Sequence, residues 1–117
     1  MIYCHDAPQH QIYTNIQDLF YDRFIRVANF KTMMRIKINA YPHTDVVKEH
    51  EDHIDYEFEN TGAVFSLNTC DGYTKFSDGS KVGSVANRIV FFDASKKHHS
   101  TTTSNAKLRY NINFNFL

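Results

Sequence analysis

Histidine and aspartate recur in pairs within one short stretch of the sequence. His43-Thr-Asp45 and His53-Ile-Asp55 each place a histidine two positions before an aspartate. On a β-strand, residues i and i+2 point to the same face about 6.6 Å apart, so either triplet can direct both side chains at one ion. His98 or His99, expected in a loop after a later apolar run, would supply a third ligand. Two histidines and one carboxylate on one side of a metal leave three positions open, as in non-haem Fe(II) sites.

One arginine further along stands in a segment of strict alternation. Arg109 shares a face with Asn111, Asn113 and Asn115, whereas the other face is apolar: Leu108, Tyr110, Ile112, Phe114 and Phe116. The pattern alone favours an ordinary strand whose polar face is exposed to solvent. If that face instead lines a pocket, Arg109 and Asn111 form a ligand surface, because a buried arginine binds a carboxylate through two parallel hydrogen bonds.

The elements that must position these residues are one helix and several short strands. Apolar spacing predicts a helix over about residues 15–31, with Thr14 and Gln17 as a capping box and an apolar face of Ile16, Leu19, Phe20, Phe24, Val27 and Phe30. Period-two alternation predicts strands at 34–41, 63–68 and 108–116, and a shorter strand at 72–76 precedes an Asp78-Gly79 turn. The apolar run at 89–92 is typical of a strand buried on both sides. Together they indicate a mainly β, jelly-roll-like barrel or sandwich with an N-terminal helical flank.

Length, charge and cysteine content limit the class of protein. A chain of 117 residues suits one domain with one core. Its 13 basic and 13 acidic side chains balance, which argues against general nucleic-acid binding. No apolar run approaches the roughly 20 residues that a membrane-spanning helix needs, and the first residues do not read as a signal peptide. Cys4 and Cys70 lack a CxxC spacing and are expected as reduced thiols, so we expect a cytoplasmic protein without membrane contact.

The order of these segments resembles the 2-oxoglutarate/Fe(II)-dependent dioxygenases, specifically their prolyl 4-hydroxylase-like branch. The matching stretch runs from Met34 to Phe116: it comprises the strand at 35–41, a His-x-Asp, Phe65-Ser-Leu-Asn68, Asp71-Gly-Tyr-Thr-Lys-Phe76 (similar to the family's Gly-Gly-x-Thr-x-Phe), the run at 87–92, the distal histidine and the segment at 109–116. The resemblance implies a double-stranded β-helix core at 34–117 behind a helical flank at 1–33, in a single domain. Short versions of this kind are similar to ones encoded by bacterial viruses.

The resemblance also implies a role for individual residues. In the family, a second strand carries the His-x-Asp, which favours His53 and Asp55 over His43 and Asp45. Alignment after Phe92-Asp93 favours His98 over His99 as the distal Fe(II) ligand. Arg109 would bind the far carboxylate of 2-oxoglutarate, and weaker candidates for contacts with this co-substrate are Tyr41, Asn68 and Thr74.

The implied activity is hydroxylation of a protein residue such as proline, with 2-oxoglutarate decarboxylated to succinate and a protein or peptide as partner. Two features depart from the family: Ala106-Lys107-Leu108 precedes Arg109 where a glycine is usual, and the segment before the first matched strand is short. Such a chain could complete its barrel as a homo-oligomer. Two alternatives are a non-catalytic jelly-roll module for structure or assembly and a cupin-type metal site, although the latter calls for His-x-His followed by Glu.

Overall fold

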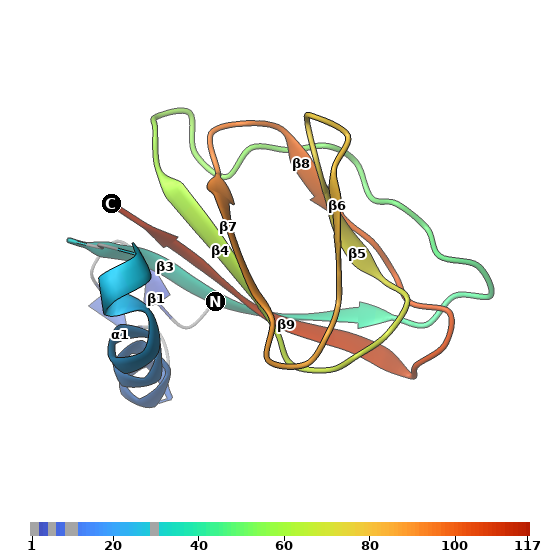
Figure 1. Cartoon of the computed structure of the whole chain (residues 1–117), viewed down its shortest axis with the longest axis horizontal. Helices are drawn as coiled ribbons and strands as arrows, with labels where there is room; N and C mark the ends of the chain where they lie inside the picture. The colour runs from blue at the N-terminus through green and yellow to red at the C-terminus, as the bar shows by residue number, and fades with distance from the viewer. Residues whose placement is uncertain (1–2, 5–6, 9–11, 29–30) are drawn as a thin grey trace.

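Two β-sheets form the body of the computed structural model, which describes residues 3–4, 7–8, 12–28 and 31–117 (Figure 1). The larger sheet has six strands in the order β2-β1-β3-β9-β4-β7, and the smaller has three in the order β6-β5-β8. The elements are β1 Tyr3–Cys4, β2 Ala7–Pro8, α1 Tyr13–Ala28, β3 Met33–Pro42, β4 Thr61–Ser66, β5 Tyr73–Phe76, β6 Lys81–Gly83, β7 Ile89–Asp93, β8 His98–Ser100 and β9 Leu108–Phe116. The arrangement is a double-stranded β-helix, or jelly roll, as the sequence predicts.

An irregular segment runs beside β8 where a further strand of the smaller sheet would lie. This segment, residues 43–60, is called the strap below; it is bridged to the chain around β8 at His43–Thr103, Glu49–Thr101 and His53–His98. The last bridge consists of two backbone hydrogen bonds of 3.0 Å, one in each direction. The expectation that His53 and Asp55 lie on a regular strand is therefore wrong. His98 begins β8 instead of lying in a loop, because its backbone pairs with Phe76 of β5 on one side and forms the bridge with the strap on the other.

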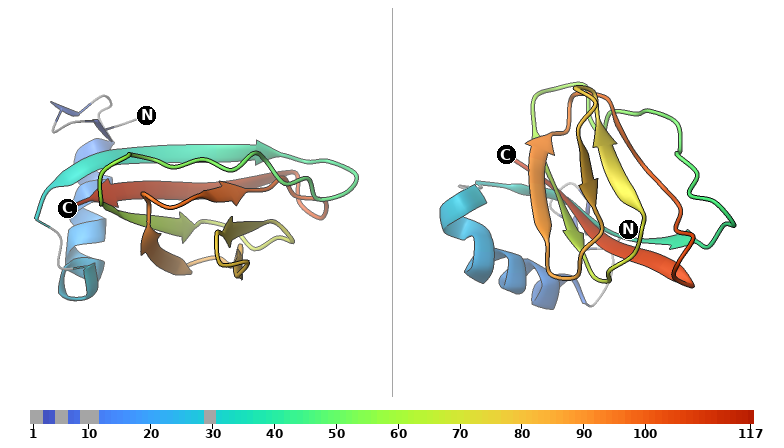
Figure 2. Two further views of the ribbon diagram at one scale, coloured as in Figure 1. Left: turned by 90° about the horizontal axis from the view of Figure 1, so that it is seen from above. Right: turned by 45° about the vertical axis from the view of Figure 1, so that its right-hand side comes forward.

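Helix α1 covers the outer face of the larger sheet, the face turned away from the smaller sheet (Figure 2). Phe20 is 1% exposed and stacks on Phe114 with 4.3 Å between the ring centroids. The apolar face of β9 completes this core together with Ile36 from β3 and Ala63 from β4. Of the apolar helix face expected from the sequence, Leu19 is 49% exposed; Phe30 and the side chain of Val27 lie outside the described residues.

The polar face of β9 points into the space between the two sheets. Arg109, Asn111 and Asn115 are each at most 2% exposed, so the expectation of a solvent-exposed polar face is wrong. Strand β9 lies between β3 and β4 in the sheet, and its apolar residues Ile112, Phe114 and Phe116 join Phe20 of α1 in the core on the other face. Polar side chains of the central strand are consequently enclosed by the smaller sheet and the strap.

Three local expectations also need correction. Helix α1 begins at Tyr13, and the Ile16 N–H donates to the Ile12 carbonyl at 3.2 Å, so Thr14 lies inside the first turn and does not cap the helix. The helix is described as far as Ala28, residues 29 and 30 lie outside the described residues, and Lys31, the expected last residue, is not helical. Strand β7 is an edge strand, and its apolar residues are half-buried because one side has no neighbouring strand.

The apolar side chains of β7 nevertheless have packing partners on both faces of the strand. Phe91 contacts Phe24 of the helix, with ring centroids 6.1 Å apart. Phe92 lies on the inner side, 4.7 Å from the ring of His98. Within the described part of the chain, no helix has the length and apolar character needed to cross a membrane.

Candidate metal centre

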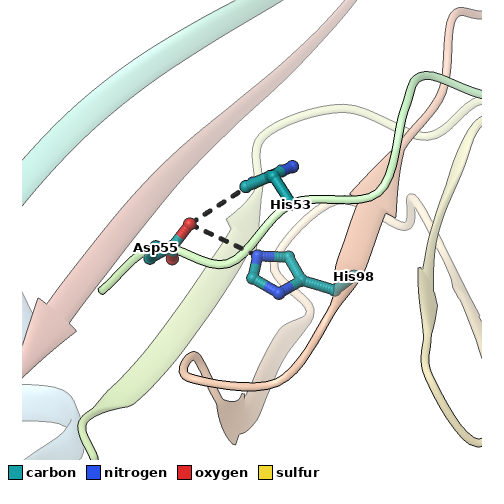
Figure 3. A group of neighbouring side chains, drawn as sticks. All are labelled: His53, Asp55 and His98. Atoms are coloured by element: carbon teal, nitrogen blue, oxygen red, sulfur yellow. Dashed lines mark ion pairs between the residues drawn. The ribbon is translucent and has the colours of Figure 1, made fainter. Parts of the chain in front are cut away.

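Three side chains from two separate segments converge on one point between the sheets (Figure 3). The strap contributes His53 and Asp55, and β8 contributes His98. Oδ1 of Asp55 lies 3.3 Å from Nε2 of His53 and 3.4 Å from Nε2 of His98. One ligand atom from each residue falls within 4.8 Å of the other two. This grouping of two imidazole nitrogens and one carboxylate oxygen is a donor set suited to Fe(II).

The ring of His98 is oriented by the backbone behind it. Its Nδ1 lies 2.8 Å from the carbonyl oxygen of Lys96, a contact in which Nδ1–H donates, so Nε2 is the ring nitrogen that faces Asp55 and would bind an ion. The side chain is 6% exposed, and Phe92 packs against the ring. His53 is more open, with 53% of its side chain exposed. One ligand is therefore fixed in the interior and the other lies at the mouth of the site.

Asp55 is held by residues of the larger sheet. The Asn115 amide donates from Nδ2 to Oδ2 of Asp55 at 2.9 Å, and Nη2 of Arg35 lies 3.4 Å from Oδ1. Arg35 in turn donates from Nε to Oδ1 of Asn115 at 3.0 Å. These contacts fix the carboxylate although the strap that carries it is irregular. Oδ1 faces the two histidines as a result.

The electrostatics of the centre favour an ionised carboxylate. Burial of Asp55 raises its pKa, but hydrogen bonds from His53, His98 and Asn115 outweigh this and hold the pKa well below its usual range. The hydrogen bond to Asp55 raises the pKa of His53. Because an imidazole nitrogen must be free of a proton to bind a metal ion, this raised pKa makes metal binding at the site more sensitive to acid.

A second polar group lies deeper in the barrel, around Arg109. Its guanidinium donates from Nη1 to the Ser100 hydroxyl and, at 3.2 Å, to the Thr101 carbonyl; Nη2 donates to Thr74 Oγ1 at 3.2 Å. Nε is buried without a hydrogen-bond partner, and none of the residues the structure describes offers this guanidinium a carboxylate. Burial lowers the pKa of Arg109. A buried cation without an anion is a costly arrangement, and an anionic ligand would relieve it.

A cavity of about 100 Å³ extends from the metal cluster to Thr74 and Ser100, two of the residues that accept hydrogen bonds from Arg109. Its walls hold the metal cluster, Thr74 and Ser100 from beside Arg109, and polar residues of β3 and β9. The lining residues are Arg35, Lys37, Asn39, Tyr41, His53, Asp55, Val64, Thr74, His98, His99, Ser100, Asn111 and Asn113. The cavity is lined by one carboxylate, that of Asp55, and by the cationic side chains of Arg35 and Lys37, so a small anionic molecule suits it.

The structure brings some of the sequence candidates to this cavity. Thr74 contacts Arg109, and the ring of Tyr41 lies 5.2 Å from the guanidinium carbon. Asn68 is engaged elsewhere: it donates to the Leu108 carbonyl and accepts from the Tyr110 N–H, both at 2.9 Å. Its amide therefore fixes the start of β9 and is not directed at a ligand.

The competing metal candidates lie apart from the cluster. Nδ1 of His43 contacts the carbonyl of Ala106 at 3.0 Å. Among the described residues, neither His43 nor Asp45 belongs to a group that could hold a metal ion. His99 lies between two acids of the strap, with Nδ1 2.6 Å from Asp52 Oδ1 and Nε2 3.3 Å from Glu49 Oε2. It ties the strap to β8 and leaves the ligand position to His98.

Sequence reasoning missed three residues that support the centre: Arg35, Asn115 and Ser100. The signal for the first two was present, because both occupy polar positions of alternating strands. Treating those positions as solvent-exposed concealed them. Nothing in the local sequence distinguishes Ser100 from its hydroxyl-bearing neighbours at 101–104.

Comparisons with solved structures agree with this architecture. No family model matches the sequence, and no curated protein does. A prolyl-4-hydroxylase from Pseudomonas putida superposes with a TM-score of 0.56 at 17% identity, covering 92% of this chain and 68% of that one. Fe(II) HppE in complex with substrate gives 0.50 at 12% identity, and a cupin protein from Bacteroides fragilis gives 0.50 at 14%.

These neighbours share the double-stranded β-helix. The superposition with HppE includes 73% of this chain and 52% of HppE, so the chain spans about half of that protein's length. The superposition with the cupin includes 80% of this chain and 72% of the cupin. At such identities the likeness shows a fold common to cupins and oxygenases. Function has to be argued from the side chains of the site.

Proposed function

We propose that the chain is an Fe(II)- and 2-oxoglutarate-dependent oxygenase that hydroxylates a protein residue such as proline. The observation that carries this proposal is a pairing of two sites: the His53-Asp55-His98 cluster lines one end of a cavity, and the buried Arg109 guanidinium lies directly behind Thr74 and Ser100, which also line it. A metal ion alone would need only the first site. A dicarboxylate that also chelates the metal needs both.

The residues of the cluster fit Fe(II). Nε2 of His53, Nε2 of His98 and Oδ1 of Asp55 would hold the ion, and the contacts of Asn115 and Lys96 already orient two of these ligands. Three protein ligands leave positions open for a bidentate co-substrate and oxygen. Bound Fe(II) and 2-oxoglutarate supply the oxidising chemistry, in which O2 gives one oxygen atom to the substrate C–H and one to succinate as CO2 leaves.

The protein's own contribution is to bind and orient. Arg109 would receive the far carboxylate of 2-oxoglutarate, with Thr74 holding Nη2 in place and the ring of Tyr41 beside the guanidinium. Val64 and Phe92 provide apolar walls near the cluster. These side chains would limit the access of water to the bound metal and co-substrate.

One anaerobic titration tests the assignment. Fe(II) and 2-oxoglutarate added to the wild-type protein should give a visible metal-to-ligand charge-transfer band, and O2 should then yield succinate. His53→Ala should lose the band. Arg109→Ala should weaken 2-oxoglutarate binding while Fe(II) binding persists. Folded, iron-loaded wild-type protein without the band would overturn the co-substrate, and absence of Fe(II) uptake would favour the non-catalytic jelly-roll module.

A further inference from the structure

Two neighbouring strands carry a ladder of polar side chains along the cavity floor. On β3 the inward residues are Arg35, Lys37, Asn39 and Tyr41; their register partners on β9 are Asn115, Asn113, Asn111 and Arg109. In an antiparallel pair, directly opposed side chains are close enough to interact, so each partnership is one rung. The metal cluster lies near the Arg35 end of the ladder. The Arg109 guanidinium, which would bind the far carboxylate of 2-oxoglutarate, lies at the Tyr41 end.

Three of the four rungs are closed by a side-chain contact. Arg35 donates to Asn115 at 3.0 Å, and Asn39 donates to Asn111 at 2.9 Å. The Arg109 guanidinium carbon lies 5.2 Å from the centre of the Tyr41 ring. The remaining rung, Lys37 with Asn113, is open: within residues 31–117, neither side chain has a hydrogen-bond or ion-pair partner.

The open rung lies next to the metal cluster. Lys37 and Asn113 line the same cavity as His53, Asp55 and His98. Arg35 is the next residue on the same face of β3, about 6.6 Å from Lys37 along the strand. Its guanidinium already contacts Asp55 and Asn115. The open rung therefore offers an ammonium group and an amide beside the metal cluster. The two side chains of each neighbouring rung already bond to each other and are not free for a ligand.

The charges already accounted for leave Lys37 without a counterpart. Arg35 faces Asp55, and both carboxylates of 2-oxoglutarate have partners in the proposed function, one at the metal and one at Arg109. We propose that the Lys37–Asn113 rung binds an acidic group of the prime substrate, so that the peptide substrate carries an aspartate or glutamate beside the hydroxylated residue. This inference rests on the proposed function and specifies its substrate class.

The two side chains suit a carboxylate together better than either does alone. The lysine supplies charge and up to three donors, and the asparagine amide supplies two more donors from a backbone position fixed in the sheet. Val64, the register neighbour of Asn113 on β4, adds an apolar surface to the same level. Lys37 is exposed and Asn113 is half-buried, so a bound peptide can reach this rung from solvent and form a charge-assisted hydrogen bond with it.

Two pools of dye-labelled synthetic peptides test the inference. Both have one length and a central proline; one carries Asp and Glu at the flanking positions, and the other carries Asn and Gln. Anisotropy measures binding to wild type, Lys37→Met, Asn113→Ala and Lys107→Met, with and without Mn(II) and 2-oxoglutarate. Lys107 is the matched control, an exposed lysine just before β9 and not among the residues that line the cavity.

Wild type should bind the acidic pool about 10-fold more tightly than the amide pool, equivalent to about 1.4 kcal/mol. Lys37→Met should lose this preference, Asn113→Ala should reduce it, and Lys107→Met should keep it. Equal binding of both pools by wild type, or an acidic preference that survives in Lys37→Met, would overturn the inference. So would a Lys37→Met variant that weakens 2-oxoglutarate binding alone, since the rung would then serve the co-substrate. Failure of the proposed function appears separately, as a missing charge-transfer band in wild type.

Discussion

Asn115 holds the carboxylate of Asp55 across the barrel: its Nδ2 donates to Asp55 Oδ2 at 2.9 Å, although the two residues are 60 positions apart in the chain. Asp55 belongs to the irregular strap, whereas Asn115 lies in β9 and is completely buried. A ligand on a segment without regular pairing thus takes its orientation from the central strand of the larger sheet. The contact leaves Oδ1 for the two histidines.

Asn115→Ala should therefore weaken metal binding while the three ligands remain. We expect the Fe(II) or Co(II) dissociation constant to rise about 10- to 100-fold, as is usual when a partner that orients a ligand is removed. Anaerobic Co(II) titration followed by its visible absorption measures this. The control is Asn111→Ala, a neighbouring buried asparagine that bonds to Asn39 instead of Asp55. Equal losses in both variants would mean that Asn115 acts only through the stability of the fold.

Substitution of the two adjacent histidines of β8, His98 and His99, should affect metal binding in different ways. His98→Ala removes a ligand and should abolish stoichiometric metal binding. His99→Ala removes the contacts with Asp52 and Glu49, so it loosens the strap that carries His53 and Asp55 and should lower the metal affinity without abolishing binding.

His43→Ala serves as the control in this series, because within residues 31–117 the one hydrogen bond of the His43 side chain is with the Ala106 carbonyl and it lies outside the metal cluster. It should bind metal as wild type does. The same Co(II) titration compares the three variants. Metal binding that survives in His98→Ala but is lost in His99→Ala would reverse the assignment of the distal ligand, and loss in His43→Ala would restore the first His-x-Asp triplet.

Gly72 gives Arg109 the room to lie where it does. A Cβ at this position would come within 2.6 Å of Arg109 Cδ and 2.8 Å of the Thr102 carbonyl oxygen. Gly72→Ala should therefore displace the arginine and destabilise the fold by about 1–3 kcal/mol, the usual cost of overpacking. Binding of 2-oxoglutarate should weaken as well, whereas Fe(II) binding should not.

Urea unfolding and the charge-transfer titration measure the two effects of Gly72→Ala. Gly83→Ala is the matched control, since the nearest atom to its added Cβ would be 3.8 Å away. If Gly72→Ala binds 2-oxoglutarate as well as the control does, Arg109 either tolerates the methyl group or does not contact the co-substrate.

The sequence was most informative where one period dominates a segment. The alternation at 34–41 and 108–116 predicted β3 and β9 to within about one residue at each end. It could not show which face is enclosed, because an alternating strand looks the same whether its polar side meets water or a second sheet. That ambiguity hid Arg35 and Asn115, and only the position of β9 between β3 and β4 resolves it.

Short and irregular elements were harder to predict for a physical reason. Strands β6 and β8 have three residues each, too few to show a period, and they exist because longer neighbours pair with them. The strap has no repeating pattern, and its course depends on hydrogen bonds with residues about 45 to 60 positions later, such as His53 with His98. The proximity of His53, Asp55 and His98 thus depends on the tertiary structure. The resemblance to a family implied it, whereas the spacing of these residues in the sequence could not predict it.

Asp71 gives the fold a predictable response to acid. Its Oδ1 accepts hydrogen bonds from Ser104 N–H at 2.8 Å and from Thr103 Oγ1 at 3.0 Å, and its Oδ2 accepts one from the Ser104 hydroxyl. These bonds lower the pKa of Asp71 from 3.8 to about 2. Because the folded-state pKa is the lower one, the unfolded chain binds more protons in this range. The contribution of Asp71 to stability is therefore complete above about pH 4 and declines as the pH falls through about 2.

Asp71→Asn removes this titration and should unfold at a lower urea concentration than wild type at pH 5. The difference in midpoint should shrink steadily as the pH is lowered from about 4 towards 2, because wild type then loses the charge that the variant never had. Urea unfolding of both proteins at half-unit intervals of pH measures it, and other acids such as Asp55 titrate alike in both and cancel in the comparison. A difference that stays constant or grows towards pH 2 would mean that the hydrogen bonds of Asp71 do not depend on its ionisation.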